Sequence, residues 1–221
     1  GVLAPASWPE AIAAAAAGLK GKRAAVLVGG RATTEDAYGY SKFARIALGT
    51  NDIDFRAPVS SDEERDFLGA KVVGSATTYR DIDIADHVVL IGFEPEEESP
   101  IVFLRINKQV RKRALKVSAV ATKLSIGVEK LKGDFIKVAP GAESAAVGAL
   151  TLTAKSIILV GERASETTGL LSAVAALGDK SGAKIAWIPR RAGERGALEA
   201  GAIGNLLPGG RPVVDASARV D

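Results

Sequence analysis

The chain has 221 residues, of which 47% are hydrophobic and 25% are charged, a composition typical of a soluble globular protein with one or two domains. The formal net charge of +3 comes from 29 basic and 26 acidic residues spread along the chain, which is weak evidence for any polyanion partner. The absence of cysteine excludes disulfides and thiolate-ligated iron–sulfur clusters from this chain, and the single histidine, His87, leaves no imidazole cluster for a transition metal.

The sequence contains no signal for a membrane or for export. No run reaches the roughly 18 consecutive apolar residues that cross a bilayer, and the N-terminus lacks the pattern of a signal peptide. We therefore expect no direct membrane insertion. The chain starts at Gly1 and contains no methionine, which fits either a segment cut from a longer protein or a chain whose tag has been removed.

The first part of the chain predicts a helix, a strand and a second helix. Ser7 stands three residues before Glu10 as a capping box, and Ala and Leu then favour a helix from about Trp8 to Leu19. RAAVLVGG predicts a central strand over residues 23–28. TTEDAYGYSKFARIALG begins with capping threonines and ends at Gly49, which predicts the next helix.

The order of strand and helix recurs further along the chain. HVVLIGFE leads into ESPIVFLRINKQVRKR, where Pro100 suits a first helical turn, and SIILVGER leads into a helix predicted over 168–177. Shorter apolar runs predict additional strands over residues 70–73, 115–120, 135–138 and 183–188. The tail from residue 190 predicts a long ordered loop with one helical turn. This alternation predicts an α/β fold with doubly wound, mostly parallel sheets and helices on both faces.

Three predicted strands end alike, in VLVGGR, VLIGFE and ILVGER. Apolar residues followed by glycine are common at any turn from a strand to a helix, so the likeness is interpreted as structural. None of the endings has the G-x-G-x-x-G fingerprint, and no Walker motif is present. Tight dinucleotide binding at these turns is not expected.

Four glutamates, Glu94 and Glu96 to Glu98, follow the second of these strands, where a helix is predicted to begin. Carboxylates at a helix N-terminus are stabilised by about 0.3–1 kcal/mol each. They repel a phosphate at 4 Å by about 4 kcal/mol at an effective dielectric near 20. We interpret them as caps that fill the turn themselves. An acid/base pair or a hard-metal site is the alternative, and no adjacent histidine or lysine completes one.

Two groups of basic residues are candidate binding surfaces. The run from Arg105 to Lys116 lacks interleaved aromatics and reaches a helix C-terminus, which favours partner docking or solvation over nucleic-acid binding. The arginines of the glycine-rich tail could hold an anion or an acidic neighbour, and they are Arg190, Arg191, Arg195 and Arg211. His87 has no partner in sequence and is interpreted as structural, and no nucleophile-elbow motif supports a Ser-His-Asp site.

The segment GRATTEDAYGYSKFARIALGTNDIDFR resembles the molybdopterin oxidoreductase superfamily, in which G-R-x-T-x-E-D-x-Y precedes K-F-A-R and G-T-N-x-I-D. GFEPEEESPIVFLRINKQVRKR and PRRAGERGALEAGAIGNLLPGGRPV are similar to the family formed by the G subunit of bacterial NADH:quinone oxidoreductase, respiratory complex I. The alanine-rich, methionine-free style resembles the actinobacterial type. The resemblance covers about residues 8–214.

This resemblance implies an internal piece of an oxidoreductase subunit that passes electrons from NADH to quinone. The family's iron–sulfur domains would precede Gly1, outside this chain. The family architecture implies two Rossmann-like subdomains, residues 1–56 with 151–221 and an inserted domain over 57–150. It also implies other peripheral-arm subunits of complex I as partners and a place on the cytoplasmic face of the cell membrane.

The molybdenum enzymes of the superfamily bind a pterin guanine dinucleotide and ligate the metal through Cys, selenocysteine, Ser or Asp. Here FRAPVSSDEERDF contains no cysteine, and Ser60 or Ser61 would have to serve as the ligand in its place. The family's G-x-N-P reads Gly92-Phe93-Glu94-Pro95, in which a carboxylate replaces an amide. The resemblance therefore implies a scaffold that lacks molybdopterin, catalytic residues and metal ligands. Its vestigial cofactor-binding candidates are Gly29, Gly30, Arg31, Gly92, Glu94, Gly161, Arg191 and Arg195.

Two other functions stay open at this point. One is a domain that binds molybdopterin guanine dinucleotide in an oxidoreductase similar to formate dehydrogenase. The other is a free-standing dinucleotide-binding protein. Metal analysis separates the scaffold from the first, and calorimetry with nucleotides separates it from the second.

Overall fold

The structure is a computed structural model that describes residues 3–56 and 61–214. The chain forms two compact units, residues 1–57 with 193–221 and residues 58–192. The first unit contains α1 (Trp8–Leu19), β1 (Val26–Leu27), α2 (Thr34–Lys42), η1 (Phe43–Ala47), β2 (Ile53–Asp54), α10 (Glu194–Glu199), β8 (Leu206–Leu207), η4 (Pro208–Gly210) and β9 (Arg211–Pro212). The second unit contains α3 (Asp62–Phe67), η2 (Leu68–Val72), α4 (Tyr79–Ile84), β3 (His87–Ile91), α5 (Pro95–Glu98), α6 (Pro100–Arg113), β4 (Lys116–Ala121), α7 (Ile126–Lys130), β5 (Asp134–Lys137), α8 (Glu143–Gly148), β6 (Ser156–Gly161), η3 (Glu162–Glu166), α9 (Leu170–Ser181) and β7 (Lys184–Ile188).

The second unit is built on a parallel sheet with the strand order β5-β4-β3-β6-β7. Every residue of β3 and β6 is buried, as expected for central parallel strands that are covered on both faces. From β3 the chain adds β4 and β5 on one side, and β6 and β7 then extend the sheet on the other side. The topology therefore switches between β3 and β6, and in this class of sheet ligands bind beyond the carboxyl ends of the strands at such a point.

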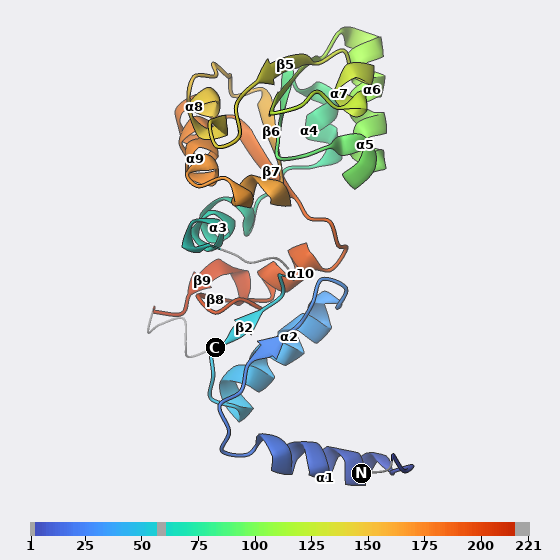
Figure 1. The fold of residues 1–221 in the computed structure, drawn as a ribbon, viewed down its shortest axis with the longest axis vertical. Helices are drawn as coiled ribbons and strands as arrows, with labels where there is room; N and C mark the ends of the chain where they lie inside the picture. The colour runs from blue at the N-terminus through green and yellow to red at the C-terminus, as the bar shows by residue number, and fades with distance from the viewer. Residues whose placement is uncertain (1–2, 57–60, 215–221) are drawn as a thin grey trace. The chain divides into compact units, whose positions relative to one another are not determined.

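Helices cover both faces of this sheet, with α4 to α7 on one side and α8 and α9 on the other (Figure 1). On the first side, α6 buries Val102, Phe103 and Ile106, a spacing of one and three residues that defines a single helical face. These side chains join alternate residues of the strands, such as Val88 and Leu90, in one apolar core. The predicted α/β class with parallel strands is confirmed.

The first unit has a smaller sheet. β1 and β2 pair in parallel, with Val26 opposite Ile53, and β8 and β9 form a short antiparallel pair. The predicted helix over Trp8–Leu19 and its capping box between Ser7 and Glu10 are confirmed. No residue of α1 is buried. Among the residues that the structure describes, no helix has the length and apolar content needed to span a membrane.

Two predicted strands differ in the structure. The strand predicted over 23–28 is limited to Val26–Leu27, and Leu27 is 80% exposed, so it is not the buried central strand that its apolar run suggested. The strand predicted over 70–73 is wrong, because these residues lie in the π-helix η2 and the turn that follows it. The buried residues Leu68 and Val72 are four apart, which is a helical spacing.

The division of the chain also differs from the predicted one. Residues 151–192, which were expected to join the N-terminal segment, lie in the second unit. The physical reason is strand pairing, because β6 pairs with β3 and β7 pairs with β6. The C-terminal part of the first unit therefore begins at residue 193 and not at 151.

Candidate functional site

The candidate site of the second unit lies where β3 and β6 end, at Gly92 and Gly161. These two glycine turns are in backbone contact. A Cβ atom on Gly161 would lie 2.3 Å from the carbonyl oxygen of Gly92, and a Cβ on Gly92, whose φ is +56°, would lie 2.5 Å from the backbone nitrogen of Ala164. Glycine is therefore required at both positions to let the two turns approach. The close contact leaves no room for a ligand between the two glycine backbones themselves.

The turn after β3 is occupied by its own glutamates. The backbone N–H of Glu94 donates to Glu98 Oε1 at 3.0 Å, and the N–H of Glu96 donates to Glu94 Oε1 at 3.3 Å. These amide groups are the ones that would otherwise face an anion. The sequence placed the glutamates at the start of one long helix, but they form a separate turn, α5, that precedes α6.

Two arginines neutralise Glu98, whose side chain is only 10% exposed. Arg163 Nη2 lies 2.5 Å from Glu98 Oε1, and Arg190 Nε lies 3.7 Å from Glu98 Oε2. A cation pair that could hold a phosphate is therefore already engaged with a carboxylate of the chain. Glu96 likewise pairs with a lysine, Lys130, at 2.5 Å.

A third carboxylate fills the helix N-terminus that follows β6. Glu63, on α3, accepts hydrogen bonds from the backbone N–H groups of Gly169 and Ser172, both at 2.8 Å, and from the Ser172 hydroxyl at 2.8 Å. Burial of Glu63 opposes its ionisation, but these hydrogen bonds outweigh it and lower the pKa of the carboxyl. Glu63 thus takes the place that a phosphate takes at a helix N-terminus.

A cavity of about 380 Å³ lies beyond the carboxyl ends of β3 and β4. Its charged lining consists of Glu94, Glu143, Glu166, Lys123 and Arg163. The volume lies within the usual range of small-molecule sites. With three carboxylates against two cations, however, the lining offers no net positive charge to a pyrophosphate.

In the first unit, the turn that follows β1 is covered by the start of α10. The backbone N–H of Gly193 donates to the carbonyl oxygen of Gly30 at 2.9 Å, and a Cβ on Gly193 would lie 2.3 Å from the Ala32 carbonyl oxygen. The Thr33 hydroxyl caps α2 by accepting from the N–H of Asp36 at 3.1 Å. Gly30 is buried, whereas Gly29 and Arg31 are exposed. This turn is closed by backbone and not by carboxylates.

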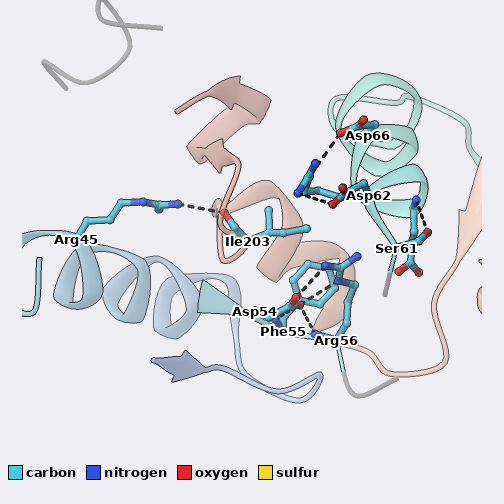
Figure 2. A network of polar contacts seen from close by, with 10 residues as sticks. Arg45, Asp54, Phe55, Arg56, Ser61, Asp62, Asp66 and Ile203 are labelled. Atoms are coloured by element: carbon cyan, nitrogen blue, oxygen red, sulfur yellow. Dashed lines mark hydrogen bonds and ion pairs between the residues drawn. The ribbon is translucent and has the colours of Figure 1, made fainter. Parts of the chain in front are cut away.

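Arg45 is a structural residue that the sequence reasoning did not single out. Its guanidinium donates to the carbonyl oxygens of Gly201, Ile203 and Leu206 at 3.0, 3.1 and 2.8 Å, and to Asn51 Oδ1 at 2.9 Å. Figure 2 shows the side chain reaching Ile203. Burial lowers the pKa of Arg45. One feature of the sequence could have indicated this role. Arg45 ends the K-F-A-R motif, and this motif and the following G-T-N-x-I-D both carry the family resemblance.

Asp54, the last residue of that segment, also has a local structural role. Its Oδ1 accepts the backbone N–H groups of Phe55 and Arg56, both at 2.8 Å, and the Arg56 guanidinium pairs with Oδ2 at 2.8 Å (Figure 2). Burial opposes ionisation of Asp54, but the contacts with Arg56 outweigh it, so the pKa of the carboxyl is lowered.

The sequence analysis considered Ser60 and Ser61 as metal ligands. Ser60 lies outside the described residues. Ser61 caps α3 by accepting from the N–H of Glu64 at 3.1 Å.

The structure brings some predicted candidates together and separates others by unit. Gly92, Glu94 and Gly161 belong to the β3 and β6 turns of the second unit. Gly29, Gly30, Arg31 and Arg195 belong to the first unit and Arg191 to the second. Arg195 is paired with Glu199 at 2.7 Å. His87 is buried at the opposite end of β3, 2.9 Å from the Ser118 hydroxyl, and burial lowers its pKa.

These residues do not fit the phosphate groups of a pterin dinucleotide. The N–H groups at the turn after β3 and at the start of α9 already donate to Glu94, Glu98 and Glu63. Each of these carboxylates would repel a phosphate that competes for the same donors. In the part of the chain that the structure describes, no group of three or more His, Asp or Glu side chains is arranged to hold a metal ion.

Comparison with known proteins places this fold in one family. The profile of the family described as molybdopterin oxidoreductase matches residues 1–183, and the chain therefore belongs to the molybdopterin oxidoreductase family. More particularly, it is 54% identical over 231 residues to the G subunit of NADH-quinone oxidoreductase from Mycobacterium bovis, and 47% identical over 253 residues to the protein of that name from Streptomyces coelicolor. Both similarities include 99% of this chain, so the predicted resemblance is confirmed.

The chain spans only 29% and 30% of the length of these two relatives. A more distant similarity is to the F420-dependent formate dehydrogenase subunit alpha of Methanocaldococcus jannaschii. It is 31% identical over 122 residues, which are 54% of this chain and 18% of that protein. The chain is thus a homologue of one region of the G subunit, with a weaker likeness to a formate dehydrogenase.

Proposed function

We propose that this chain is a structural domain of the G subunit of an NADH-quinone oxidoreductase, and that it binds no pterin dinucleotide. One observation carries the proposal. Backbone N–H groups after β3 and at the start of α9, which could bind a phosphate, donate instead to Glu98 and Glu63. A scaffold gains helix capping and ion pairing from these carboxylates, whereas a nucleotide site would lose its donors.

Exposed apolar side chains support a role in assembly. In the first unit, Trp8, Ile12, Leu27 and Ile46 are between 62% and 82% exposed. α1, which carries two of these side chains, buries none of its residues within the described chain, and an apolar helix without a packing partner favours contact with other protein. A two-stranded sheet such as β1 with β2 also needs further packing to be stable. We infer that this unit packs against other parts of the subunit or of its complex.

The proposal assigns the redox chemistry to other parts of the assembly. Electrons would pass from NADH to quinone through iron–sulfur clusters held outside these 221 residues, and the other peripheral-arm subunits would be the partners of this domain. It would lie on the cytoplasmic face of the cell membrane through the complex, without inserting into the bilayer. Within this chain, Glu63, Glu98 and Arg45 would act as positioning residues of the fold.

Metal and cofactor analysis of the full-length subunit tests this proposal. The purified subunit is assayed for iron, molybdenum and tungsten, and for guanine nucleotide released by acid. We expect iron from clusters elsewhere in the subunit, no stoichiometric molybdenum or tungsten, and no released guanine nucleotide. Molybdenum together with guanine nucleotide, each stoichiometric with the subunit, would overturn the proposal.

The same assay decides the second candidate function, a molybdopterin guanine dinucleotide-binding domain of a formate dehydrogenase-like enzyme. The cavity of about 380 Å³ beside Glu94 and the likeness to the formate dehydrogenase subunit favour this alternative. It requires the dinucleotide to displace Glu63 or Glu98 from backbone N–H groups. The molybdenum and nucleotide content of the subunit separates the two functions directly.

A further inference from the structure

The outer face of α6 carries two exposed apolar residues followed by exposed cations. Ile101 and Leu104 are 58% and 59% exposed, and Lys108 and Arg111 are exposed one and two turns further on. These positions are three or four residues apart and so lie on one helical face. The opposite face of α6 is buried in the core of the second unit. The exposed face is therefore a separate surface, with an apolar half and a cationic half.

The neighbouring helix α4 extends the apolar half. Tyr79 is 51% exposed, and the Arg105 guanidinium lies over its ring at 5.1 Å. Arg105 is also paired with Asp83 at 2.5 Å, and Gln109 donates to the same carboxylate at 2.9 Å. Through these contacts α4 and α6 are fixed to each other. A surface on two fixed helices loses little conformational entropy when a partner binds.

Lys108 and Arg111 differ from Arg105 and Arg113 of the same helix in their contacts with the rest of the chain. Arg105 is paired with Asp83, and Arg113 donates to the carbonyl oxygen of Ala85 at 2.5 Å. Within the described residues, by contrast, no ion pair is formed by Lys108, Arg111 or Lys112. The helix dipole accounts for cations in the last turn. It does not account for Lys108, which precedes that turn, or for the exposed Ile101 and Leu104.

We propose that this surface, formed by Tyr79, Ile101, Leu104, Lys108 and Arg111, docks an acidic helix of a neighbouring subunit. The inference rests on the proposed function as part of a multisubunit assembly. The helix would place apolar side chains on Ile101 and Leu104 and carboxylates beside Lys108 and Arg111. Aromatic residues and arginine are enriched in protein interfaces, and charge complementarity would fix the register of the helix. An anionic lipid surface is the competing occupant, and a lipid adduct in the experiment below would reveal it.

Site-specific photo-crosslinking in the assembled oxidoreductase tests this surface. A photoreactive amino acid replaces Leu104, which is exposed and so tolerates the change, and a second sample carries it at the exposed Lys180 of α9 as a matched control. The cross-linked peptides are identified by mass spectrometry. We expect one dominant protein adduct from position 104, in a segment with carboxylates within two helical turns of the attachment point, and none to that segment from position 180.

Charge reversal gives the second readout. The double variant Lys108→Glu with Arg111→Glu is expected to lower the yield of the 104 adduct about tenfold, which corresponds to about 1.4 kcal/mol of lost coupling. Lysines in place of the partner's carboxylates are expected to restore the yield. Adducts to lipid, to a second copy of the chain or to a segment without carboxylates would overturn the inference, as would a yield unchanged by charge reversal. The cofactor content of the same preparation reports separately on the proposed function.

Discussion

Glu63 shows how one side chain can replace a ligand. It lies on α3, yet its hydrogen-bond donors are Gly169 and Ser172, more than 100 residues later in the chain. A carboxylate so placed satisfies two of the N–H groups that the first turn of a helix leaves unpaired. It also brings negative charge to the positive end of α9. The residue is therefore expected to stabilise the fold and to exclude an anion from the same place.

Replacing Glu63 tests this role. Glu63→Gln keeps one oxygen acceptor but removes the charge, so we expect the free energy of unfolding to fall by about 1 kcal/mol, and by about 2 kcal/mol for Glu63→Ala. Urea denaturation measures both. Glu129→Gln, an exposed position on α7, is the matched control and is expected to change stability by less than about 0.5 kcal/mol. Equal effects at the two positions would refute the role of Glu63.

Asp81 gives the fold a pH dependence of known sign. Its carboxylate contacts Lys184 at 2.5 Å and accepts from the N–H of Thr78 at 2.6 Å, and these bonds lower the pKa of Asp81 from 3.8 to about 2. Because the pKa is lower in the folded state, this carboxylate contributes stability that is fully present above pH 3.8 and is lost as the pH falls towards 2. The stability is lost because the unfolded state binds the proton of Asp81 at a higher pH than the folded state does.

The corresponding measurement is the free energy of unfolding of the wild type and of Asp81→Asn between pH 6 and pH 2. We expect the variant to be less stable at pH 6 and the difference between the two to shrink below pH 3.8. Lys184→Met removes the strongest cause of the lowered pKa and is expected to reduce the pH-dependent part. A difference that stays constant down to pH 2 would contradict this assignment.

Among the elements, the two glycine turns after β3 and β6 lie in contact at the place where the sheet topology changes direction. Gly161→Ala would force a Cβ to within 2.3 Å of the Gly92 carbonyl oxygen, and we expect it to lower the free energy of unfolding by about 1–3 kcal/mol. Gly148→Ala is the control, because a Cβ there meets no atom within 4 Å and alanine suits its place at the end of α8. If both variants are equally stable, the two turns are not in contact.

The short helix α5 provides a test of the glutamates as a group. The triple variant Glu96→Gln, Glu97→Gln, Glu98→Gln is expected to unfold cooperatively and to bind nucleotide no more tightly than the millimolar range. Glu94 is unchanged in this variant and still accepts from the N–H of residue 96. A glutamine at position 98 keeps an oxygen that can accept from the Glu94 N–H, so these donors stay occupied. Calorimetry with GTP measures the affinity. Tight binding by this variant would mean that the glutamates act as a gate and not as part of the fold.

Most elements of the second unit could be predicted from local pattern, whereas η2 and β1 could not. β3 and β6 were predicted because each is a continuous apolar run closed by glycine, which is typical of a buried parallel strand. The sequence of η2 predicts a strand because its apolar run is as short as a strand, and only its continuity with α3 marks it as helical. β1 was overestimated because the sequence does not show how many neighbours a strand will have.

For the whole molecule, the negative charge at the candidate site could be predicted but its arrangement could not. Glu94 and Glu96 to Glu98 were recognised because they are close together in sequence. Glu63 was missed because its partners are distant in sequence, and so were Arg163 and Arg190 as the partners of Glu98. The unit boundary at residue 193 was missed for the same reason, because it depends on the pairing of β6 with β3. Interactions between distant residues decide both the site and the domain division.

We infer that the positions where this fold would hold phosphate groups are filled by the domain's own side chains and backbone. Calorimetric titration of the 221-residue chain with GDP, which carries the pyrophosphate and guanine groups of the family's dinucleotide, tests it most directly. We expect no saturable heat of binding up to millimolar ligand, both for the wild type and for Glu63→Gln. Saturable micromolar binding by the wild type, weakened by Arg163→Ala, would contradict it.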